Sequence, residues 1–447
     1  MNIDFLIDNF KKHPNNEWIS WEGKILFYSD LLDVISSTSA FIRNHKIVKG
    51  SVVALLGDFS PNAIALLLSL IVEDCIIIPL TYQEEETIQS KLKIAQAEVI
   101  IKVNDFQNTF SIEFTDIRAS HTYFNLIKSK DTSGLVLFTS GTSGFPKAAI
   151  HNFENLLAKF KNQRRTYRTI NFLLFDHWGG LNTLFSTLSN CGMVIPIKNR
   201  NPENICYNVE KHKIQLLPVS PSFLNLLIIG ESYKNFDMRS LELITYGAEP
   251  MPESTLKKAQ FLFPQVKFQQ TYGLIELGVL RSKSKEDGSL WVKLGGEGYK
   301  LRVRDNLLEI KAESAMIGYL NAPSPFTEDG YFMTGDMVEQ NGEYYKVLGR
   351  KSELINVGGE KVYPQEVENH ILQFEGVEDV TVYGEKNAIM GNIVCANVFI
   401  KETLNEKEII REIKNFCKQS LSAFKVPVKI KIQNQPLFNS RFKKKRN

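Results

Sequence analysis

The sequence predicts an α/β protein with a large N-terminal lobe, in which helices cover mostly parallel sheets, a small β-rich subdomain, and a small mobile α+β lobe at the C-terminus. Three observations lead to this prediction. The 447 residues exceed the roughly 250–300 at which a single core stops growing. Short apolar runs alternate with helical patterns through the first part of the chain. Alternating strands with turn signals follow from about residue 285, and a compact mixed segment follows residue 351.

The first strand–helix region covers residues 51–103. Strands that alternate with helices favour βαβ units and a parallel sheet covered on both faces. Apolar strands are expected at 51–58, 75–82 and 98–103, and helices at 61–73 and 86–97. A second region of the same kind has expected strands at 172–178, 193–197 and 214–220, and a helix over 179–192.

The part of the chain after about residue 285 is richer in expected strands. Expected strands lie at 290–296, 299–312 and 330–351, and the pair Asn341-Gly342 is typical of a tight hairpin turn. The last segment is expected to form helices at 362–374 and 406–421 and strands at 377–385, 392–401 and 426–433. We therefore expect one lobe of residues 1–349 and another of residues 350–447, with a hinge near residues 349–353.

Composition excludes several classes of protein. The chain is 43% hydrophobic and 23% charged, and its net charge of +3 gives no field that would favour nucleic acid. Its five cysteines are scattered without a C-x-x-C pair, so reduced core thiols are expected. The amphipathic N-terminus differs from a signal peptide, and no apolar stretch reaches the about 20 residues of a membrane span. A cytoplasmic protein without a membrane span is expected.

Residues 137–152, LFTSGTSGFPKAAIHN, hold a loop rich in glycine and hydroxyl groups. Backbone N–H groups in such a turn form a concave anion site, hydroxyls add donors, and Lys147 adds a positive charge. The candidate phosphate ligands are Thr139, Ser140, Gly141, Thr142, Ser143, Gly144 and Lys147. The Walker pattern does not fit, because Pro146 precedes the lysine and no Ser or Thr follows it. Taken alone, this composition is equally typical of a flexible turn.

The order T-S-G-T-S-G-x-P-K resembles the phosphate loop of the adenylate-forming superfamily, which comprises acyl-CoA synthetases, adenylation domains of peptide synthetases, and luciferases. Four more stretches resemble family elements in the family's order: YGAEP at 246–250, QTYGLIELG at 270–278, YFMTGDM at 331–337 and GRKSELINVGGEKVYPQEVE at 349–368. The resemblance covers nearly the whole chain, which is short for the family. It implies an ATP- and acid-binding lobe (1–349) and a rotating lobe (350–447).

The resemblance also implies a two-step reaction. A carboxylate attacks the α-phosphate of ATP and expels pyrophosphate, and a thiol of CoA or of a phosphopantetheine carrier then displaces AMP. Both steps accumulate negative charge, which requires cations, Mg²⁺ and N–H dipoles. By the match, Glu276 would help to hold Mg²⁺, Tyr272 would stack on adenine, Asp336 would bind the ribose hydroxyls, and Arg350 would reach the ribose. Gly247, Ala248 and Glu249 would line the base, with Gly273 beside them. The alternative for each is a surface charge or a core aromatic.

The chain departs from the family pattern at three places. Ile275 stands where the family usually has Thr before the glutamate, and it cannot hydrogen-bond a phosphate oxygen. Ser352 occupies the hinge position that often holds Asp or Lys, and a small polar residue can still absorb a rotation. The family's C-terminal Gly-Lys is missing, and we place the catalytic lysine at Lys443 within PLFNSRFKKKRN. Lys444 and Lys445 are chemically equivalent choices, and a solvated basic tail is the alternative.

The acid substrate and the thiol acceptor are inferred from two further stretches. LFDHWGGLNTLF at 174–185 resembles the element with the family's pocket histidine, so His177 is expected beside the carboxylate, with Gly179 next to it. Trp178 would shorten the pocket if its indole points inward, and Asp176 could bind a substrate ammonium or face away. These residues favour a short or polar acid. Gly358 and Gly359 resemble the loop that lines the pantetheine tunnel, where they leave room for a thin arm.

Three functions stay open at this point. The first is an ATP-dependent acid–CoA ligase, whose basic tail could meet the CoA phosphates. The second is a ligase that loads an acyl or amino-acid group onto a carrier protein. The third is a non-catalytic nucleotide-binding relative, which Ile275 and the missing Gly-Lys favour. Hydrolase and metallopeptidase motifs are absent from the sequence.

Overall fold

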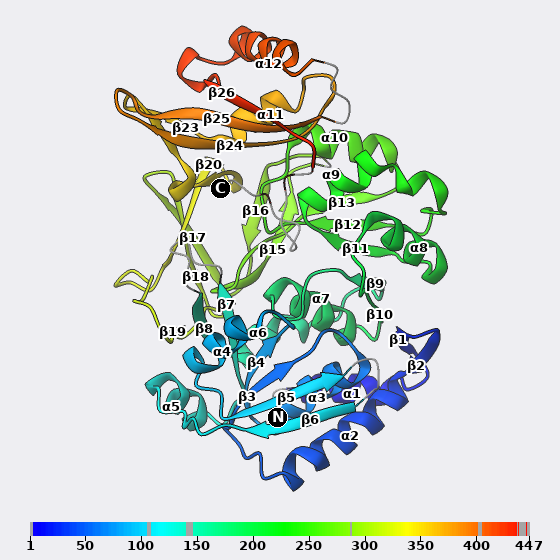
Figure 1. Cartoon of the computed structure of the whole chain (residues 1–447). Coiled ribbons are helices and arrows are strands. Elements are labelled where there is room, and N and C mark those ends of the chain that lie inside the picture. Colours follow the sequence, from blue (N-terminus) through cyan, green and yellow to red (C-terminus); the bar gives the residue numbers. More distant parts are fainter. Residues whose placement is uncertain are drawn as a thin grey trace.

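The computed structural model describes residues 3–104, 109–139, 146–286, 288–400, 405–435, 437 and 444. Figure 1 shows a large lobe with three sheets and a small lobe at the top of the view, in orange and red, with a fourth sheet. The predicted α/β class and the two-lobed arrangement are confirmed.

The first sheet, at the bottom of Figure 1, has the strand order β19-β8-β7-β4-β3-β5-β6. Its four central strands run parallel, and antiparallel strands complete both edges. All five residues of β3 are buried, as expected for a strand that is covered on both faces. The bounds are β3 Val52–Leu56, β4 Ile76–Leu80, β5 Val99–Asn104, β6 Thr109–Phe114, β7 Gly134–Thr139, β8 Lys147–Asn152 and β19 Gly318–Tyr319.

The second sheet has the order β13-β12-β11-β9-β10-β1-β2 and is parallel except for β2. Its strand β1 comes from the start of the chain, and Ile19 pairs with Val194 of β10. The bounds are β1 Glu17–Trp21, β2 Lys24–Phe27, β9 Arg168–Asn171, β10 Met193–Pro196, β11 Leu216–Val219, β12 Leu243–Tyr246 and β13 Lys267–Gln270.

The third sheet is antiparallel and forms the predicted β-rich subdomain, with the order β14-β15-β16-β21-β20-β18-β17. The predicted hairpin is confirmed: Asn341 pairs with Tyr344, and Gly342 has a positive φ of 60°. The bounds are β14 Tyr272–Leu274, β15 Gly278–Ser284, β16 Val292–Gly295, β17 Tyr299–Arg304, β18 Leu307–Ala312, β20 Phe332–Asn341 and β21 Tyr344–Arg350.

The fourth sheet belongs to the small lobe and has the order β23-β22-β25-β24, with β26 paired to β25. Its own apolar core packs α11 and α12 against the sheet. The bounds are β22 Ile355–Val357, β23 Glu360–Val362, β24 Val377–Asn387, β25 Gly391–Ile400, β26 Lys429–Gln433, α11 Pro364–Ile371 and α12 Glu406–Ser420.

Several helices of the large lobe begin at side-chain caps. The Ser60 hydroxyl accepts from the Ala63 N–H, and Pro61 occupies the first position of α3, so this apolar helix starts where the sequence predicts. The bounds are α1 Asp4–Lys12, α2 Tyr28–Asn44, α3 Pro61–Val72, α4 Glu85–Ile94, α5 Thr122–Ser129, α6 Phe153–Leu157, α7 Trp178–Ser189, α8 Pro202–His212, α9 Pro221–Gly230 and α10 Glu253–Leu262. Short 3₁₀ turns cover Ala158–Phe160, Ser232–Asn235, Lys351–Glu353 and Ala423–Lys425.

One predicted strand was wrong. Residues 172–177 form a turn that leads into α7, which begins at Trp178, and the strand lies before them in β9. The apolar side chains Phe172 and Phe175 are buried in this turn. A Cβ at Gly180 would lie 2.2 Å from the Leu174 carbonyl oxygen, so the turn packs on the first turn of the helix. Burial without a regular strand explains the misleading apolar run.

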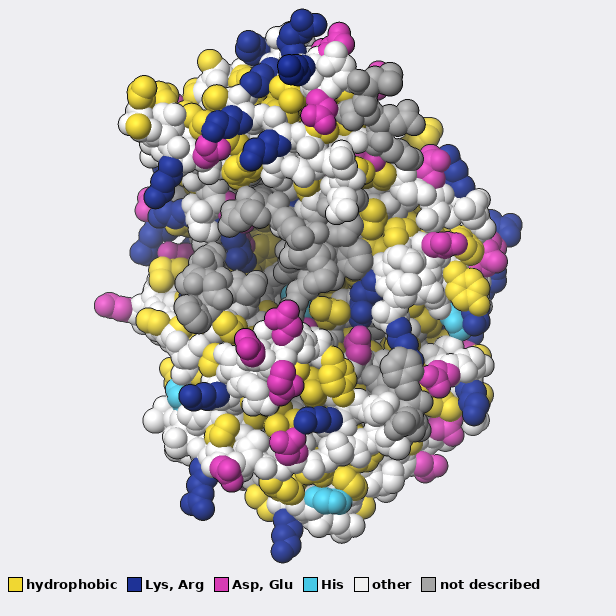
Figure 2. Space-filling view, in the orientation of Figure 1, with side chains coloured by type: hydrophobic (Ala, Val, Ile, Leu, Met, Phe, Trp, Pro, Cys, Tyr) yellow, Lys and Arg dark blue, Asp and Glu magenta, His cyan; other side chains and the backbone are white. Residues whose placement is uncertain are grey.

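Three further observations concern the molecule as a whole. The five cysteines are free and buried, as predicted. Figure 2 shows acidic and basic side chains interspersed over most of one face, with Lys and Arg gathered at the top, over the small lobe. None of the helices within the described ranges has the length and apolar composition that a membrane crossing requires.

Candidate active site

A cavity of about 680 Å³ lies where the carboxyl ends of the parallel strands β11, β12 and β13 meet the third sheet. In open α/β sheets, ligands bind at this end of the strands. Ten of the residues singled out from the sequence line the cavity. They are Thr139, Lys147, His177, Trp178, Gly179, Gly247, Ala248, Gly273, Glu276 and Arg350.

The other predicted residues do not line this cavity or cannot be placed. Asp176, Glu249, Tyr272, Asp336, Ser352, Gly358 and Gly359 are described but lie outside the lining. Ser140, Gly141, Thr142, Ser143, Gly144 and Lys443 lie outside the described residues. Thr139 and Lys147, which flank the glycine-rich segment, pair across β7 and β8.

The turn after β12 requires glycine at its first residue. A Cβ at Gly247 would lie 2.3 Å from the Thr271 hydroxyl oxygen and 2.7 Å from the Thr271 carbonyl oxygen. The next residue, Ala248, has a φ of 70°, in the left-handed region that few non-glycine residues adopt. The backbone of this turn therefore faces the cavity at close range, which suits a flat aromatic ligand.

Glu276 is held at the cavity by a tyrosine from the opposite side. The Tyr319 hydroxyl donates to Glu276 Oε1 at 2.6 Å, and Lys147 Nζ lies 5.4 Å from the centre of the Tyr319 ring. Burial, and then the nearby charge of Glu276, raises the pKa of Tyr319 far above its usual value. The hydroxyl therefore stays protonated and donates. Tyr319 was missed in the sequence, where a Gly-Tyr pair in a short strand carries no motif.

The donor set around Glu276 suits one cation shared with a ligand. No cluster of three or more His, Cys, Asp or Glu side chains occurs among the described residues. Mg²⁺ usually binds proteins through one or two carboxylates together with substrate phosphates. The Tyr319 hydroxyl binds only Oε1 of Glu276. The other carboxylate oxygen, Oε2, fits that mode of binding.

Asp336 belongs to a buried polar group beneath the cavity. It is 6% exposed, its Oδ2 accepts from the Tyr272 hydroxyl at 2.6 Å, and its Oδ1 lies 3.4 Å from Arg350 Nε. Burial raises the pKa of Asp336, and the Arg350 charge opposes that shift. Tyr272 is 7% exposed, so its ring packs in the core and its hydroxyl orients Asp336. Arg350 extends from this pair to the cavity wall.

The start of α7 presents His177 to the cavity. The His177 Nδ1 accepts from the Gly179 N–H at 3.0 Å, which caps the helix and places the proton of the neutral ring on Nε2. Trp178 is 1% exposed and packs edge-on against Phe153, so most of its indole lies in the core. The edge of the indole that remains is part of the cavity wall.

Asp176 faces away from the cavity, toward α4. Its Oδ2 accepts from Gln83 Nε2 at 3.2 Å and lies 4.0 Å from Lys91 Nζ. Lys91 itself lines the cavity, so the charge that faces a ligand here is positive rather than negative. No motif points to Lys91, which lies in a helix with other polar residues. An ammonium-binding role for Asp176 has no support in this geometry.

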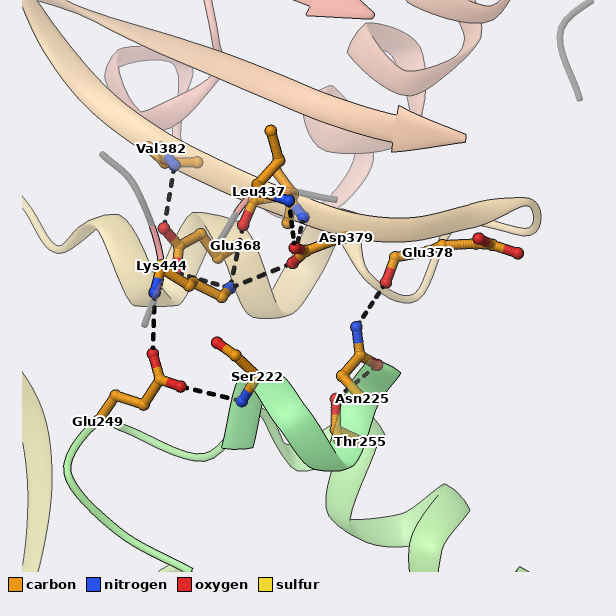
Figure 3. A network of polar contacts seen from close by, with 11 residues as sticks. Ser222, Asn225, Glu249, Thr255, Glu368, Glu378, Asp379, Val382, Leu437 and Lys444 are labelled. Carbon is orange, nitrogen blue, oxygen red and sulfur yellow. Dashed lines mark hydrogen bonds and ion pairs between the residues drawn. The ribbon is translucent and has the colours of Figure 1, made fainter. Parts of the chain in front are cut away.

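The small lobe contacts the large one through a polar network, drawn in Figure 3. Glu249 accepts from the backbone N–H groups of Ser222, at 2.9 Å, and Lys444, at 3.2 Å. The Lys444 ammonium enters the small lobe, 3.4 Å from Glu368 Oε2 and 3.8 Å from Asp379 Oδ1. Lys444 therefore lies between the lobes and contacts both.

Gly358 and Gly359 form the tight turn between β22 and β23. Their φ values are 59° and 94°, which only glycine adopts readily in succession. A Cβ at Gly358 would lie 2.8 Å from Met390 Cε, whereas nothing lies within 4 Å of one at Gly359. The turn geometry alone explains both glycines. Ser352 lies in the 3₁₀ turn Lys351–Glu353, between β21 and β22.

Two sequence families match the chain. The family described as "AMP-binding enzyme" matches residues 6–296, and "AMP-binding enzyme C-terminal domain" matches residues 366–441. The first match alone spans more than half of the chain.

Individual relatives are similar over nearly the full length. The "Long-chain-fatty-acid–CoA ligase" of Bacillus subtilis (strain 168) is 23% identical, over 94% of this chain and 89% of the relative. The "2-succinylbenzoate–CoA ligase" of Listeria innocua is 26% identical, over 94% of this chain and 92% of the relative. The crystal structure of the anthranilate CoA ligase AuaEII in complex with anthranoyl-AMP superposes with a TM-score of 0.85 at 17% identity, over 99% of this chain and 95% of the other, and shows the same fold.

Proposed function

Because this chain belongs to the AMP-binding enzyme family, within the adenylate-forming superfamily, we propose that it activates a carboxylic acid as acyl-AMP and transfers the acyl group to a phosphopantetheine thiol. One observation supports this most: a single cavity is lined by Lys147, Arg350, Glu276 and the Gly247 turn. Lys147 and Arg350 supply two cations for phosphate, and Glu276 supplies one carboxylate for a metal. The Gly247 turn supplies a backbone surface without bulky side chains for the adenine base. The ATP-dependent, AMP-forming acid–thiol ligases carry out this chemistry.

The first half-reaction requires charge stabilisation above all. The acid carboxylate attacks the α-phosphate of ATP, the bond to pyrophosphate breaks, and negative charge builds up on the phosphate oxygens. Lys147 and Arg350 face that charge from different walls of the cavity. His177 directs its Nε2–H toward the acid carboxylate, because Nδ1 is occupied by the Gly179 N–H. Mg²⁺ bound at Glu276 would neutralise phosphate charge.

The second half-reaction requires a change at the lobe boundary. We assign residues 1–349 to ATP and acid binding and residues 350–447 to a rotating lobe, with the hinge at Ser352. A 3₁₀ turn at the hinge is short and can absorb a backbone rotation. Rotation would bring the Gly358–Gly359 turn toward the path of the thiol. Lys443 acts in the first half-reaction only.

CoA is the proposed acceptor, and the acid is proposed to be short or polar. The Bacillus relative is named for long-chain fatty acids and the Listeria relative for 2-succinylbenzoate, and both are named as CoA ligases. The shared element is CoA, whereas the acids differ. The Lys and Arg side chains over the small lobe suit the phosphates of CoA.

Pyrophosphate release tests the proposal. The purified protein is incubated with ATP and Mg²⁺ and with acids from acetate to long fatty acids, including amino and hydroxy acids, with and without CoA. Release with one class of acid, and a faster steady rate with CoA, is expected. Glu276→Gln should lower the rate roughly 10²-fold or more, because it removes the metal ligand. Glu339→Gln, an exposed carboxylate on β20, is the matched control.

Other results would select the other functions. Turnover with a phosphopantetheinylated carrier protein but not with CoA would identify the carrier-loading ligase. ATP binding without pyrophosphate release from any acid would identify the non-catalytic relative. One observation favours the non-catalytic relative. Ile275 lines the cavity beside Glu276, and its apolar side chain offers no hydrogen bond to phosphate.

A further inference from the structure

A second cavity, of about 440 Å³, continues the first along the face of the second sheet, beside α7. The two cavities share wall residues from α7, β11, β12 and β15, so they adjoin each other. The shared residues are Asn182, Thr183, Pro218, Thr245, Thr271 and Val279. The second cavity extends to Leu216 and Leu243, at the amino ends of the parallel strands. A ligand that reacts at His177 and extends beyond it would enter this space.

Lys159 brings a positive charge into this second cavity. It lies in the 3₁₀ turn that follows α6, and its ammonium donates to Asn182 Oδ1 and, at 2.8 Å, to the Val279 carbonyl oxygen. Both partners are neutral, so the ammonium is solvated by the protein without being neutralised. Asn182 lines both cavities, and it therefore places the lysine near the point where they join.

Two arginines add to this charge. Arg164 and Arg281 line the same cavity, and neither forms an ion pair with an acidic side chain among the described residues. Arg165 also lines the cavity, but it pairs with Glu242 at 2.5 Å. No Asp or Glu of the described residues lines this cavity. Lys159, Arg164 and Arg281 thus form a positive cluster without a counter-charge, which we call the cationic cluster.

Within the cationic cluster, Arg164 and Arg281 are exposed, whereas Lys159 is partly buried and its charge is destabilised when the cavity is empty. Burial, and then the charges of Arg164 and Arg281, lowers the pKa of Lys159 to about 7. These three positive groups repel one another at the end of a ligand cavity. An anionic group on the ligand would offset that repulsion, which explains why the cluster is there. The walls between them carry hydroxyl and amide groups, including Ser186, Thr187 and Asn190, which suit a polar ligand better than an alkyl chain.

We propose that the acid substrate is a dicarboxylic acid, whose second carboxylate binds the cationic cluster while the reacting carboxylate lies beside His177. The inference rests on the proposed function for the reacting end, and it names the substrate class. The distal carboxylate accepts hydrogen bonds from Lys159 and from the arginines at the outer part of the cavity. Hydrogen bonds to charged groups are the strong ones, and the partly buried Lys159 disfavours a ligand that cannot accept from it.

The test compares dicarboxylic acids of graded length with their monomethyl esters. The ester keeps the length and the reacting carboxylate and loses only the distal charge. Two readouts are used with each pair: kcat/KM for pyrophosphate release, and the ligand-induced shift of the unfolding temperature. We expect at least one diacid to exceed its ester by about tenfold to a hundredfold in kcat/KM, and to give the larger thermal shift.

Variants locate the effect in the cavity. Lys159→Met and Arg281→Gln should each lower kcat/KM for the diacid by about tenfold or more, chiefly through KM, and leave the ester unchanged or improved. Lys161→Met is the matched control, because Lys161 is two residues away, exposed, and does not line the cavity. Arg281 lies at the exposed end of the cluster, so its variant tests the same site if Lys159→Met affects folding.

The outcomes separate this inference from the proposed function. Esters or simple fatty acids that react as fast as every diacid would overturn the inference and leave the ligase function in place. Diacid binding that depends on Lys159, without pyrophosphate release from any acid, would support the inference and overturn the ligase function. Neither binding nor release of any diacid over the range of lengths would overturn the inference.

Discussion

At the scale of single residues, the site depends on side chains that position other side chains. The Tyr319 hydroxyl donates to one carboxylate oxygen of Glu276, and the Lys147 ammonium lies over the Tyr319 ring. Because the Tyr319 pKa is raised, this hydroxyl donates throughout the physiological range. The carboxylate is therefore fixed before a metal or ATP arrives, which reduces the ordering cost of binding.

The first prediction concerns this tyrosine. Tyr319→Phe removes the hydroxyl and keeps the ring under Lys147, so Glu276 loses its orientation but not its charge. We expect the Mg²⁺ concentration for half-maximal pyrophosphate release to rise by roughly tenfold, with a smaller loss of maximal rate than in Glu276→Gln. Titration of Mg²⁺ at saturating ATP measures this. An unchanged Mg²⁺ requirement would show that Tyr319 has no positioning role.

A second prediction at this scale concerns pH. The groups that face Lys159 are Arg164, Arg281, Asn182 and the Val279 carbonyl, and none of these partners titrates near neutrality. A lysine with a pKa of about 7 loses its charge as pH rises through 7, whereas a bound carboxylate raises that pKa again. KM for a diacid should therefore increase from pH 7 to pH 9, with proton uptake on binding.

The measurement is calorimetry in two buffers with different ionisation enthalpies, together with KM as a function of pH. Lys159→Met should remove both the proton uptake and the rise in KM. A diacid that binds wild type without proton uptake at pH 8 would contradict the lowered pKa. The monomethyl ester serves as the control ligand, because its distal end carries no charge.

At the scale of elements, Lys444 joins the two lobes. Lys444 donates its backbone N–H to Glu249, while its side chain crosses to Glu368 on α11 and Asp379 on β24 (Figure 3). Both carboxylates are less than 7% exposed, and burial raises the pKa of Asp379 while the Lys444 charge opposes that shift. A second contact, from Asn225 Nδ2 to the Glu378 carbonyl oxygen at 2.8 Å, lies beside the first. This part of the small lobe is thus fixed against α9.

The third prediction follows from this burial. Lys444→Met removes an ammonium from two buried carboxylates, and breaking a buried ion pair in this way costs about 3–5 kcal/mol. Unfolding of the small lobe in urea should shift to markedly lower concentration. Lys429→Met is the matched control, because Lys429 pairs with Glu385 on the exposed surface of the same lobe, and its loss should change little. Equal effects of the two substitutions would contradict the structural role of Lys444.

The elements also show what a sequence can and cannot predict. The parallel strands β3, β4 and β5 were predicted, because apolar side chains fill both of their faces and the helices between them are periodic. The segment 172–178 was misread, since an apolar run that is buried in a turn looks the same as a strand. Several residues within contiguous motifs, such as Lys147 and Glu276, line the cavity.

Residues that act through tertiary contacts were not predictable in the same way. Tyr319 meets Glu276 only because β19 pairs with β8, and Lys159 meets Val279 only because the 3₁₀ turn Ala158–Phe160 lies beside β15. The spacing of residues along the sequence does not indicate such contacts. The direction of Asp176 was likewise undetermined in sequence, since its orientation depends on Lys91 and Gln83 from another helix and loop.

At the scale of the whole molecule, stability depends on separate apolar cores, one of them confined to the small lobe. The large lobe contains a fully buried histidine, His151 on β8, whose pKa burial lowers to about 4. The folded lobe therefore holds this ring neutral, whereas the unfolded chain binds a proton from about pH 6.5 downward. Acid is expected to unfold the large lobe through this group among others.

The fourth prediction states how the free energy of unfolding changes with pH. Between pH 6.5 and 4, the unfolded state binds more protons at His151 than the folded state, so the free energy of unfolding falls as pH falls, by at most about 1.36 kcal/mol per pH unit. His151→Leu should flatten this dependence, and His13→Leu, at an exposed position, should not. Urea unfolding at a series of pH values measures it. Equal slopes for wild type and His151→Leu would contradict the prediction.

The pairing of β1 with β10 also affects how the protein is made. Asn16 donates to the Cys191 carbonyl 175 positions further along the chain, and Ile19 is opposite Val194. A ribosome that adds about 5–20 residues per second needs roughly 10–35 s between these two segments. During that interval β1 can pair with β2 and α1 can pack on α2, but the edge of β1 that pairs with β10 has no partner strand. Nascent chains should therefore need a chaperone on their first residues until β10 has left the exit tunnel.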